Sequence, residues 1–310
     1  MDRARRHYAD EEAVLATDGT RYTYAELGER ADRFSAALQE RGIEKGDRVA
    51  VLDPNTHYHL EAAYGAMQVG AIHTPLNYRL TPDDFSYMLS DAGVDAVYAD
   101  AEYAANIEAV RDEVPTETFL TNDADAVAGD WESFDEALAD ADPDAYERPE
   151  MDEDDVITIN YTSGTTGDPK GVCRTHRAET LHAYLITIHQ EITDDDVYLW
   201  TLPMFHVNGW GHIYAITGMA PGTSVPAGST SPRRSTGSAP RTCRTSVRRR
   251  PSSTCSATTT PSTAARRPAT TTCGSPPRAQ RRRRRRFAPS RRSSAGSSNT
   301  CTARPRPDRS

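Results

Sequence analysis

The chain has 310 residues, enough for one large domain or two modest ones, and a formal net charge of −9. It contains no apolar run of the roughly 18 residues that a membrane-spanning helix needs, and no apolar signal-peptide core near its first residue. Its five cysteines form no CxxC pair, so neither a zinc site nor a disulfide framework is indicated. We therefore expect a cytoplasmic protein with no membrane span and no bound structural metal.

Two parts of opposite charge make up the total. Residues 1–220 carry 44 acidic and 15 basic side chains, whereas residues 221–310 carry one acidic side chain and 21 arginines. The whole chain has only two lysines, Lys45 and Lys170. An acidic surface poor in lysine keeps a dense hydration shell in concentrated salt, so we expect a halophilic protein. An ordinary acidic enzyme is the alternative.

The first part of the chain begins with a helix and a strand. Apolar residues recur at helical spacing within residues 21–52, Gly42 ends that helix, and residues 48–52 follow as a buried strand. Residues 59–72 predict a second helix that leads to a short strand. The apolar positions of the first helix are Leu27, Ala31, Phe34, Ala37 and Leu38.

A third helix and a third strand continue the alternation. Residues 81–93 predict a helix with Thr81 as its N-cap and Pro82 at its first position, and residues 94–100 predict the next strand. Strands that alternate with helices at this spacing favour an α/β fold with a parallel sheet covered by helices.

The next segments are an acidic stretch and a second group of regular elements. Residues 121–154 are acidic and irregular, so we expect an excursion over the surface. Residues 156–163 predict a strand, residues 177–190 a helix, and the apolar residues 196–219 a buried strand, a loop and the start of a helix.

A loop rich in glycine and threonine, "YTSGTTGDPKGV", runs from Tyr161 to Val172. Its glycines let the backbone turn tightly and approach an anion, its hydroxyl groups donate hydrogen bonds, and its lysine adds a mobile positive charge. The loop is not a Walker A motif, because Lys170 precedes Gly171 instead of a serine or threonine. We expect a polyphosphate site, and its candidate residues are Thr162, Ser163, Gly164, Thr165, Thr166, Gly167 and Lys170.

This loop resembles the phosphate-loop signature of the adenylate-forming (AMP-binding) superfamily, which contains acyl-CoA synthetases, luciferases and the adenylation domains of peptide synthetases. The strings "YTYAEL", "KGDRVAVL", "GAIHTPLNYRLTPDDFSYML" and "LPMFHVNGW" resemble further blocks of that family and occur in its order. The resemblance covers residues 1–220 and is closest to the acyl-CoA synthetase branch. It implies the stacked parallel sheets and helices of the front part of that fold.

The resemblance also implies a reaction. In that family a carboxylate attacks the α-phosphate of Mg-ATP to give an acyl-adenylate and pyrophosphate, and coenzyme A then displaces AMP to form a thioester. The segment Thr162–Gly167 and Lys170 would hold the β- and γ-phosphates and spread the charge on the leaving pyrophosphate. ATP, magnesium, coenzyme A and a fatty acid are therefore the expected cofactor and substrates.

Three residues of the "LPMFHVNGW" block and its surroundings need separate interpretations. By the resemblance, His206 would line the wall where acyl group and nucleotide meet; the alternative is a packed, hydrogen-bonded core histidine. His206 and His212 could be metal ligands, but no third ligand is apparent, so we expect no metal site there. Trp210 is expected in the core or in the wall of an acyl pocket.

Several blocks of the family do not occur in this sequence. The Y-G-x-T-E block, whose glutamate helps hold magnesium, the later aspartate that binds the ribose, and the small C-terminal domain with its catalytic lysine are absent. We therefore expect the front part of a longer enzyme, with complete activity lost or impaired.

The composition of residues 221–310 suggests that this segment is read out of frame. Of its 90 residues, 84 are Ser, Thr, Pro, Ala, Arg, Gly or Cys, whose codons all have C or G at the second base. Back-translation read from each third base is compatible with RVATAGSAPPPAT for residues 273–286 and with YGATETGP for residues 301–309. The second string contains the missing Y-G-x-T-E block. We expect a frameshift near residues 219–222 and a disordered tail.

Two other functions stay open at this point. The adenylation half-reaction could serve a different acceptor, such as the thiol of a carrier protein. A non-enzymatic alternative is a degenerate nucleotide-binding remnant whose basic arm binds nucleic acid.

Overall fold

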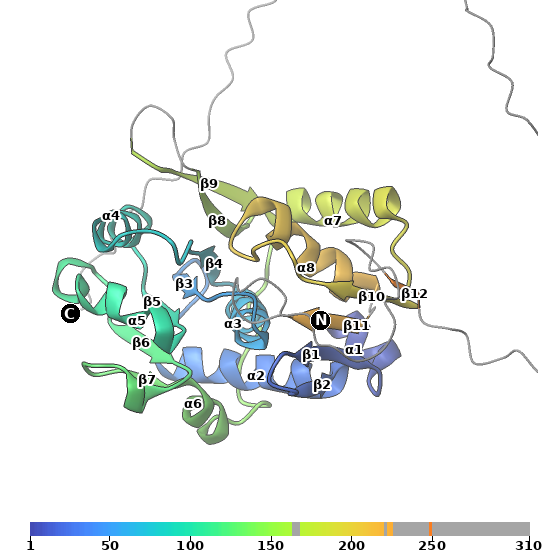
Figure 1. Cartoon of the computed structure of the whole chain (residues 1–310), viewed down its shortest axis with the longest axis horizontal. Helices are drawn as coiled ribbons and strands as arrows, with labels where there is room; N and C mark the ends of the chain where they lie inside the picture. Colours follow the sequence, from blue (N-terminus) through green and yellow to red (C-terminus); the bar gives the residue numbers. More distant parts are fainter. Residues whose placement is uncertain (163–167, 220–221, 226–247, 250–310) are drawn as a thin grey trace, which may run out of the picture. The chain divides into compact units, whose positions relative to one another are not determined.

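The computed structural model describes residues 1–162, 168–219, 222–225 and 248–249 (Figure 1). All of these belong to one of the two units into which the chain divides; the other unit, Pro251–Ser298, contains no described residue. None of the described helices combines the length and apolarity needed to cross a membrane. The helices are α1 (Asp2–Tyr8), α2 (Tyr24–Glu40), α3 (His57–Gln68), α4 (Pro82–Ala92), α5 (Ala101–Glu108), α6 (Phe134–Asp140), α7 (His176–Gln190) and α8 (Val207–Met219).

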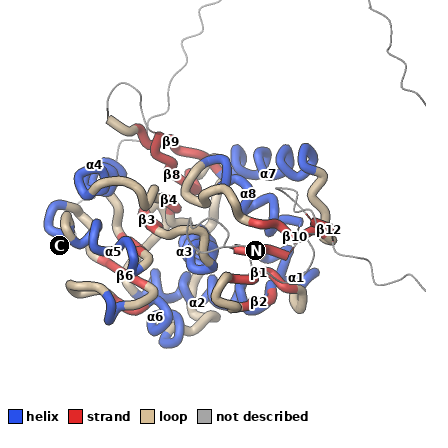
Figure 2. The backbone as a smooth tube through the Cα atoms, in the orientation of Figure 1, coloured by secondary structure: helices blue, strands red, loops and turns tan. Residues whose placement is uncertain are grey.

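A seven-stranded sheet has the order β7-β6-β5-β3-β4-β8-β9 (Figure 1), and all neighbouring pairs run parallel except β8 and β9, which form an antiparallel hairpin. Figure 2 marks the strands in red among the helices in blue. The predicted α/β class with a mainly parallel sheet is therefore confirmed. Its strands are β3 (Arg48–Leu52), β4 (Ile72–Pro75), β5 (Ala96–Ala99), β6 (Thr118–Thr121), β7 (Glu132–Ser133), β8 (Val156–Thr162) and β9 (Lys170–Thr175).

A five-stranded sheet joins segments from the two ends of the described chain. Its order is β12-β10-β11-β1-β2, and β11 lies parallel to both β1 and β10. Strands β11 and β12 lie within residues 221–310, for which we expected no regular structure, so that expectation is wrong at these two places. A strand can form there without apolar side chains because hydrogen bonds between backbones hold it. The remainder of that segment lies outside the described residues. The strands are β1 (Glu12–Ala16), β2 (Arg21–Thr23), β10 (Asp196–Leu199), β11 (Gly222–Val225) and β12 (Arg248–Arg249).

Helices cover both faces of the seven-stranded sheet, and alternate strand residues enter two separate cores. Val49, Val51 and Tyr98 pack with α2, α3 and α6 on one face. Ala50 and Val97 pack with α4 and α5 on the other face. A strand buried on both faces reads as a continuous apolar run, which is why "RVAVL" could be recognised in the sequence.

Helices α2 and α3 approach closely at Gly65. A Cβ atom added there would lie 2.6 Å from Phe34 Cδ1 and 3.0 Å from the carbonyl oxygen of Ala31. The hydroxyl of Ser35 donates to the Gly65 carbonyl oxygen at 3.0 Å and so joins the two helices. The absence of a side chain at Gly65 therefore sets the spacing of this helix pair.

The ends of α4 confirm the prediction made from local sequence. Thr81 is the N-cap, its hydroxyl accepts from the backbone N–H of Asp84, and the Asp84 side chain accepts from the Thr81 backbone in return. Pro82 occupies the first turn, and Gly93 ends the helix in the left-handed conformation with φ of 61°.

The expected surface excursion at residues 121–154 is wrong in its middle part. In that part, strand β7 pairs in parallel with β6, and the short helix α6 follows it. The residues Phe134 and Leu138 of α6 are only 0% and 2% exposed. Trp131 is also buried, and its ring packs against Phe119 at 5.4 Å. The many acidic residues of this stretch obscured, in the sequence, the few apolar residues that its helix buries.

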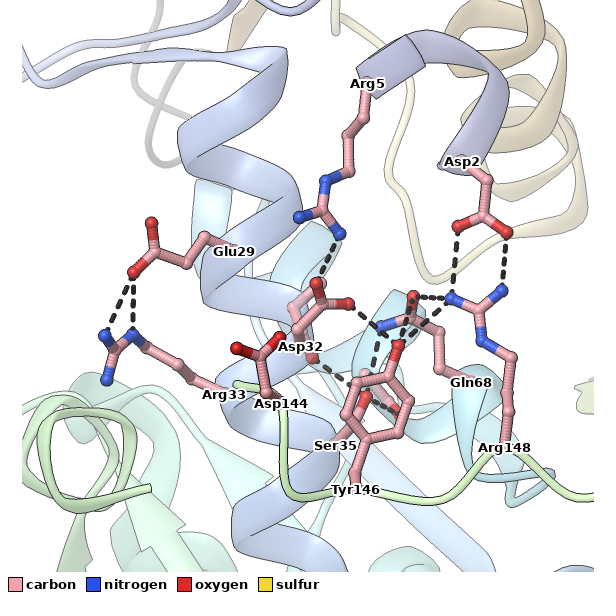
Figure 3. A network of polar contacts seen from close by, with 12 residues as sticks. Asp2, Arg5, Glu29, Asp32, Arg33, Ser35, Gln68, Asp144, Tyr146 and Arg148 are labelled. Carbon is pink, nitrogen blue, oxygen red and sulfur yellow. Dashed lines mark hydrogen bonds and ion pairs between the residues drawn. The ribbon is translucent and has the colours of Figure 1, made fainter. Parts of the chain in front are cut away.

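A polar network ties α1 to the body of the unit (Figure 3). The Arg148 guanidinium donates to Asp2 at 3.1 Å and to the side-chain oxygen of Gln68 on α3 at 2.6 Å. Arg5 pairs with Asp32 on α2. The network therefore links α1, α2, α3 and the segment that leads into β8.

Candidate functional site

The predicted phosphate loop joins the two strands of the β8–β9 hairpin. Thr162 is the last residue of β8, Lys170 is the first of β9, and the two lie opposite each other in the ladder. The Thr162 hydroxyl donates to the carbonyl oxygen of Lys170 at 3.4 Å. Both residues are exposed. The predicted ligands Ser163, Gly164, Thr165, Thr166 and Gly167 lie outside the described residues.

The hairpin opens at the carboxyl edge of the sheet, where neighbouring parallel strands end. Asn55 follows β3 at this edge, and its side chain holds the segment after β10. Its Nδ2 atom donates to the carbonyl oxygens of Trp200 at 3.3 Å and Leu202 at 2.7 Å. Its Oδ1 atom accepts from the backbone N–H of Met204 at 2.7 Å. Ligand sites of open α/β sheets lie at this edge.

The segment held by Asn55 continues into the predicted residue His206. The ring of Phe205 packs edge-on against Tyr78, which follows β4, with ring centres 5.2 Å apart. The Arg79 guanidinium lies 4.7 Å from the Tyr78 ring centre and 6.0 Å from that of Phe205. Because β4 lies next to β8, the segment around His206 and the phosphate-loop hairpin meet the same edge of the sheet.

His206 itself is exposed, which does not fit the alternative of a packed core histidine. Its backbone N–H donates to the Pro203 carbonyl oxygen at 3.1 Å, and its carbonyl oxygen accepts from Gly209 at 2.8 Å. The close turn leaves no room for a Cβ atom at Gly209, which would meet the Pro203 carbonyl oxygen at 2.1 Å. The role of His206 beside the acyl group stays a prediction. The side chain of Trp210 lies outside the described residues.

His212 lies elsewhere, in the apolar core under α8. Its ring stacks on Tyr198 with centres 5.2 Å apart, and its Nε2 atom lies 2.9 Å from Gln190 Nε2. Among the residues that the structure describes, no group of three His, Cys, Asp or Glu side chains is placed to hold a metal ion.

A buried polar group that the sequence did not reveal lies beneath the carboxyl edge. Asp53, which follows β3, is fully buried and accepts from the Thr56 hydroxyl at 2.8 Å and from the Tyr98 hydroxyl at 3.3 Å. Burial raises the pKa of Asp53 well above its ordinary value, and the nearby Asp100 adds to the rise. The only signal of this group in the sequence is a carboxylate directly after the apolar run "RVAVL".

Two buried histidines lie close to each other here, and Nδ1 of one of them, His59, is 4.0 Å from Oδ1 of Asp53. His59 and His73 pack edge-on with ring centres 5.3 Å apart. Burial lowers the pKa of His59 to about 3 and lowers the pKa of His73 well below its ordinary value. Both rings are therefore neutral at pH 7. We interpret Asp53, His59 and His73 as polar residues within the core of the fold.

A cavity of about 500 Å³ lies between α1, α7 and α8. Its wall includes Glu179, whose carboxylate pairs with Arg174 and whose pKa burial raises to about 7 against the opposing effect of that arginine. Arg3, Tyr184 and Tyr214 also line it. Of the predicted phosphate and acyl-site residues whose side chains the structure describes, Thr162, Lys170 and His206 do not line it.

Known proteins resemble this chain over most of its length. The family model of the AMP-binding enzyme matches residues 1–272. The 4-hydroxybutyrate–CoA ligase 2 of Metallosphaera sedula is 31% identical over 222 residues, which are 69% of this chain and 40% of that protein. The long-chain-fatty-acid–CoA ligase of Thermus thermophilus is 37% identical over 201 residues, covering 64% and 36%.

A solved structure agrees with these relatives. The inhibitor-bound N-terminal domain of FACL13 from Mycobacterium tuberculosis superposes with a TM-score of 0.65 at 31% identity, over 73% of this chain and 56% of that one. The present chain spans about two fifths of the length of the curated relatives named above.

Proposed function

Because this chain belongs to the AMP-binding enzyme family, we propose that it carries the phosphate-binding part of an acid–thiol ligase that activates a carboxylic acid with ATP. The named relatives are CoA ligases, which supports coenzyme A as the final acceptor. A fatty acid is the proposed substrate class, in line with the fatty-acid ligase of Thermus thermophilus.

One observation carries the proposal most directly. The hairpin holds Thr162 and Lys170 side by side at the carboxyl edge of the sheet. Both are exposed, and the segment around His206 contacts the neighbouring strand's end at the same edge. A hydroxyl donor and a primary ammonium group on a Gly- and Thr-rich turn fit the oxygens of a polyphosphate. Magnesium would arrive on the phosphates of ATP, which supply several of its oxygen ligands.

The chemistry proposed for this edge has two steps. A substrate carboxylate oxygen forms a bond to the α-phosphorus of ATP, and the bond to the bridging oxygen breaks to release pyrophosphate. The Lys170 ammonium group would stabilise the negative charge that grows on the leaving pyrophosphate. In the second step the thiol sulfur of coenzyme A bonds to the acyl carbon. The bond between that carbon and the oxygen bridging to phosphorus breaks, AMP departs with this oxygen, and the thiol proton goes to solvent.

The two lysines of the chain provide a matched test. Lys170→Ala is expected to weaken ATP binding, measured by titration calorimetry, about 10- to 100-fold, because it removes a charge-assisted contact with phosphate. Lys45→Ala is the control, since Lys45 pairs with Asp155 at 2.6 Å and takes no part in the proposed site. Equal ATP affinity of both variants and the unmodified chain, or no ATP binding at all, would contradict the proposal.

The complete reaction is expected to be weak in this polypeptide. The Y-G-x-T-E block and the ribose-binding aspartate that the family uses do not occur in its sequence. An assay of ATP–pyrophosphate exchange with short and long carboxylic acids should therefore give little signal. Robust exchange would show that the residues present suffice.

We also propose that the arginine-rich segment, residues 221–310, arises from a shift of reading frame near residues 219–222. Its support is the codon bias and the YGATETGP string compatible with residues 301–309. Sequencing the DNA across these codons tests it: an intact single frame would refute it. Salt-sensitive DNA binding that disappears on deletion of residues 221–310 would instead favour a nucleic-acid-binding arm.

A further inference from the structure

Helix α4 contacts the phosphate-loop hairpin through the residue that precedes Thr162. The hydroxyl of Tyr161 donates to Asp91 Oδ2 at 2.7 Å and lies 3.3 Å from the carbonyl oxygen of Met88. Both partners belong to α4. Burial raises the pKa of Tyr161, so its hydroxyl keeps its proton and remains a donor to the carboxylate. The end of β8 is therefore attached to α4 by a charge-assisted hydrogen bond.

A second contact attaches the other side of the same hairpin. The hydroxyl of Tyr87 donates to the carbonyl oxygen of Pro169 at 3.1 Å, directly before Lys170. Tyr87 and Asp91 are four residues apart, so they lie on one face of α4. One helix face thus contacts both stems of the loop, each time at the residue adjacent to a proposed phosphate ligand.

The ring of Tyr161 also fills the space across the hairpin. Tyr161 lies opposite Gly171 in the ladder, where an added Cβ atom would come within 3.3 Å of Tyr161 Cζ and 2.9 Å of Ile159 Cγ2. A glycine at this position leaves room for the end of the Tyr161 ring beside β9, while its hydroxyl reaches α4. The aromatic side chain therefore packs against β9 and hydrogen-bonds to the helix.

The helix that makes these contacts is itself firmly held. Phe85 and Leu89 are both 0% exposed in the core beneath it. The capping box at Thr81 and the left-handed Gly93 fix its two ends. A helix anchored at both ends and along its buried face is a rigid support for a loop.

We propose that α4 positions the phosphate-binding residues, with Tyr161, Asp91 and Tyr87 as positioning residues that hold Thr162 and Lys170 in place. This inference rests on the proposed function of the hairpin. Holding both stems before the nucleotide arrives lowers the ordering cost of binding, so the contacts raise ATP affinity without touching the ligand.

Single-atom changes test it. Tyr161→Phe and Tyr87→Phe remove only a hydroxyl, and each is expected to weaken ATP binding about 10-fold, the equivalent of one hydrogen bond. Asp91→Ala should match Tyr161→Phe, whereas Asp91→Asn keeps an acceptor oxygen and should recover most of the affinity. Tyr8→Phe is the matched control. The Tyr8 hydroxyl donates to Asp194 Oδ2 at 3.0 Å, and neither residue belongs to the hairpin or to α4.

Amide hydrogen exchange of Thr162 and Lys170 in the nucleotide-free chain gives a second readout. The variants at Tyr161 and Tyr87 should exchange these amides faster, with a thermal midpoint no lower than that of Tyr8→Phe. If the unmodified chain fails to bind ATP, the proposed function is wrong, while the exchange rates still decide whether α4 holds the hairpin. Unchanged exchange and unchanged affinity in the variants at Tyr161 and Tyr87 would overturn the inference.

Discussion

Replacing Gly65 with alanine measures how tightly α2 and α3 pack. On an exposed helix this change stabilises by about 1 kcal/mol through helix propensity. Here the new Cβ would lie 2.6 Å from Phe34 Cδ1, 2.9 Å from Phe34 Cβ and 3.0 Å from the Ala31 carbonyl oxygen. Phe34 is 0% exposed, and its ring packs against that of Phe134 with centres 4.7 Å apart. Overpacking of this kind costs about 2–3 kcal/mol, so we expect a net loss of about 1–2 kcal/mol.

Urea denaturation followed by circular dichroism at constant salt measures this free energy of unfolding. Gly218→Ala in α8 is the control, because a Cβ there would have no atom within 4 Å, and it should stabilise by up to about 1 kcal/mol. Phe34→Leu should rescue part of the loss if the aromatic ring is the obstacle. A Gly65→Ala chain at least as stable as the unmodified protein would refute the close-packing explanation.

Three other changes test separate parts of the structure. Asn55→Ala should cost about 2–4 kcal/mol, measured by urea denaturation, because it removes three hydrogen bonds and leaves the backbone N–H of Met204 without this acceptor; a loss under about 1 kcal/mol would contradict the role of this side chain. His59 and His73 have pKa values lowered by burial, so stability that is full above pH 6.5 should fall as the pH drops below it, by about 1.4 kcal/mol per pH unit for each ring. The variant His73→Gln should show a slope of unfolding free energy against pH that is smaller by about 1.4 kcal/mol per pH unit, because one titrating ring is lost. An unchanged slope would contradict the burial of His73 as a neutral ring. Thr81→Ala should lower the unfolding free energy by about 1 kcal/mol through loss of the α4 cap, whereas Thr81→Ser should not, and equal stability of the two variants would contradict the cap.

Local signals in the sequence predicted much of the fold. Thr81 and Pro82 identified the start of α4 because capping acts within one helical turn, and the run "RVAVL" identified a strand buried on both faces. The middle of residues 121–154 was mistaken for surface because Trp131 and Phe134 sit among acidic residues. Their burial depends on the neighbouring sheet, which no local window contains.

The site was predictable only as far as its motif. The Gly- and Thr-rich loop pointed to Thr162 and Lys170, and the structure places both at the carboxyl edge. The hydrogen bonds of Asn55 to residues 200–204 join parts of the chain that are some 145 positions apart. The contacts of Tyr161 with α4 span 70 positions. Such contacts arise from the three-dimensional arrangement of the strands, and they cannot be predicted from the spacing of residues within a short stretch of sequence.

The two sheets impose an order on events during synthesis. Every strand of the seven-stranded sheet lies between residues 48 and 175, so that sheet can assemble as soon as this stretch has left the ribosome. Strand β1 is made much earlier, yet its parallel partner β11 begins only at Gly222. At translation rates of roughly 5–20 residues per second, about 200 intervening residues leave one edge of β1 without that partner for on the order of 10–40 seconds. The buried residues Ala13 and Val14 must wait through this interval, which makes the first strand of the chain among the last to be completed.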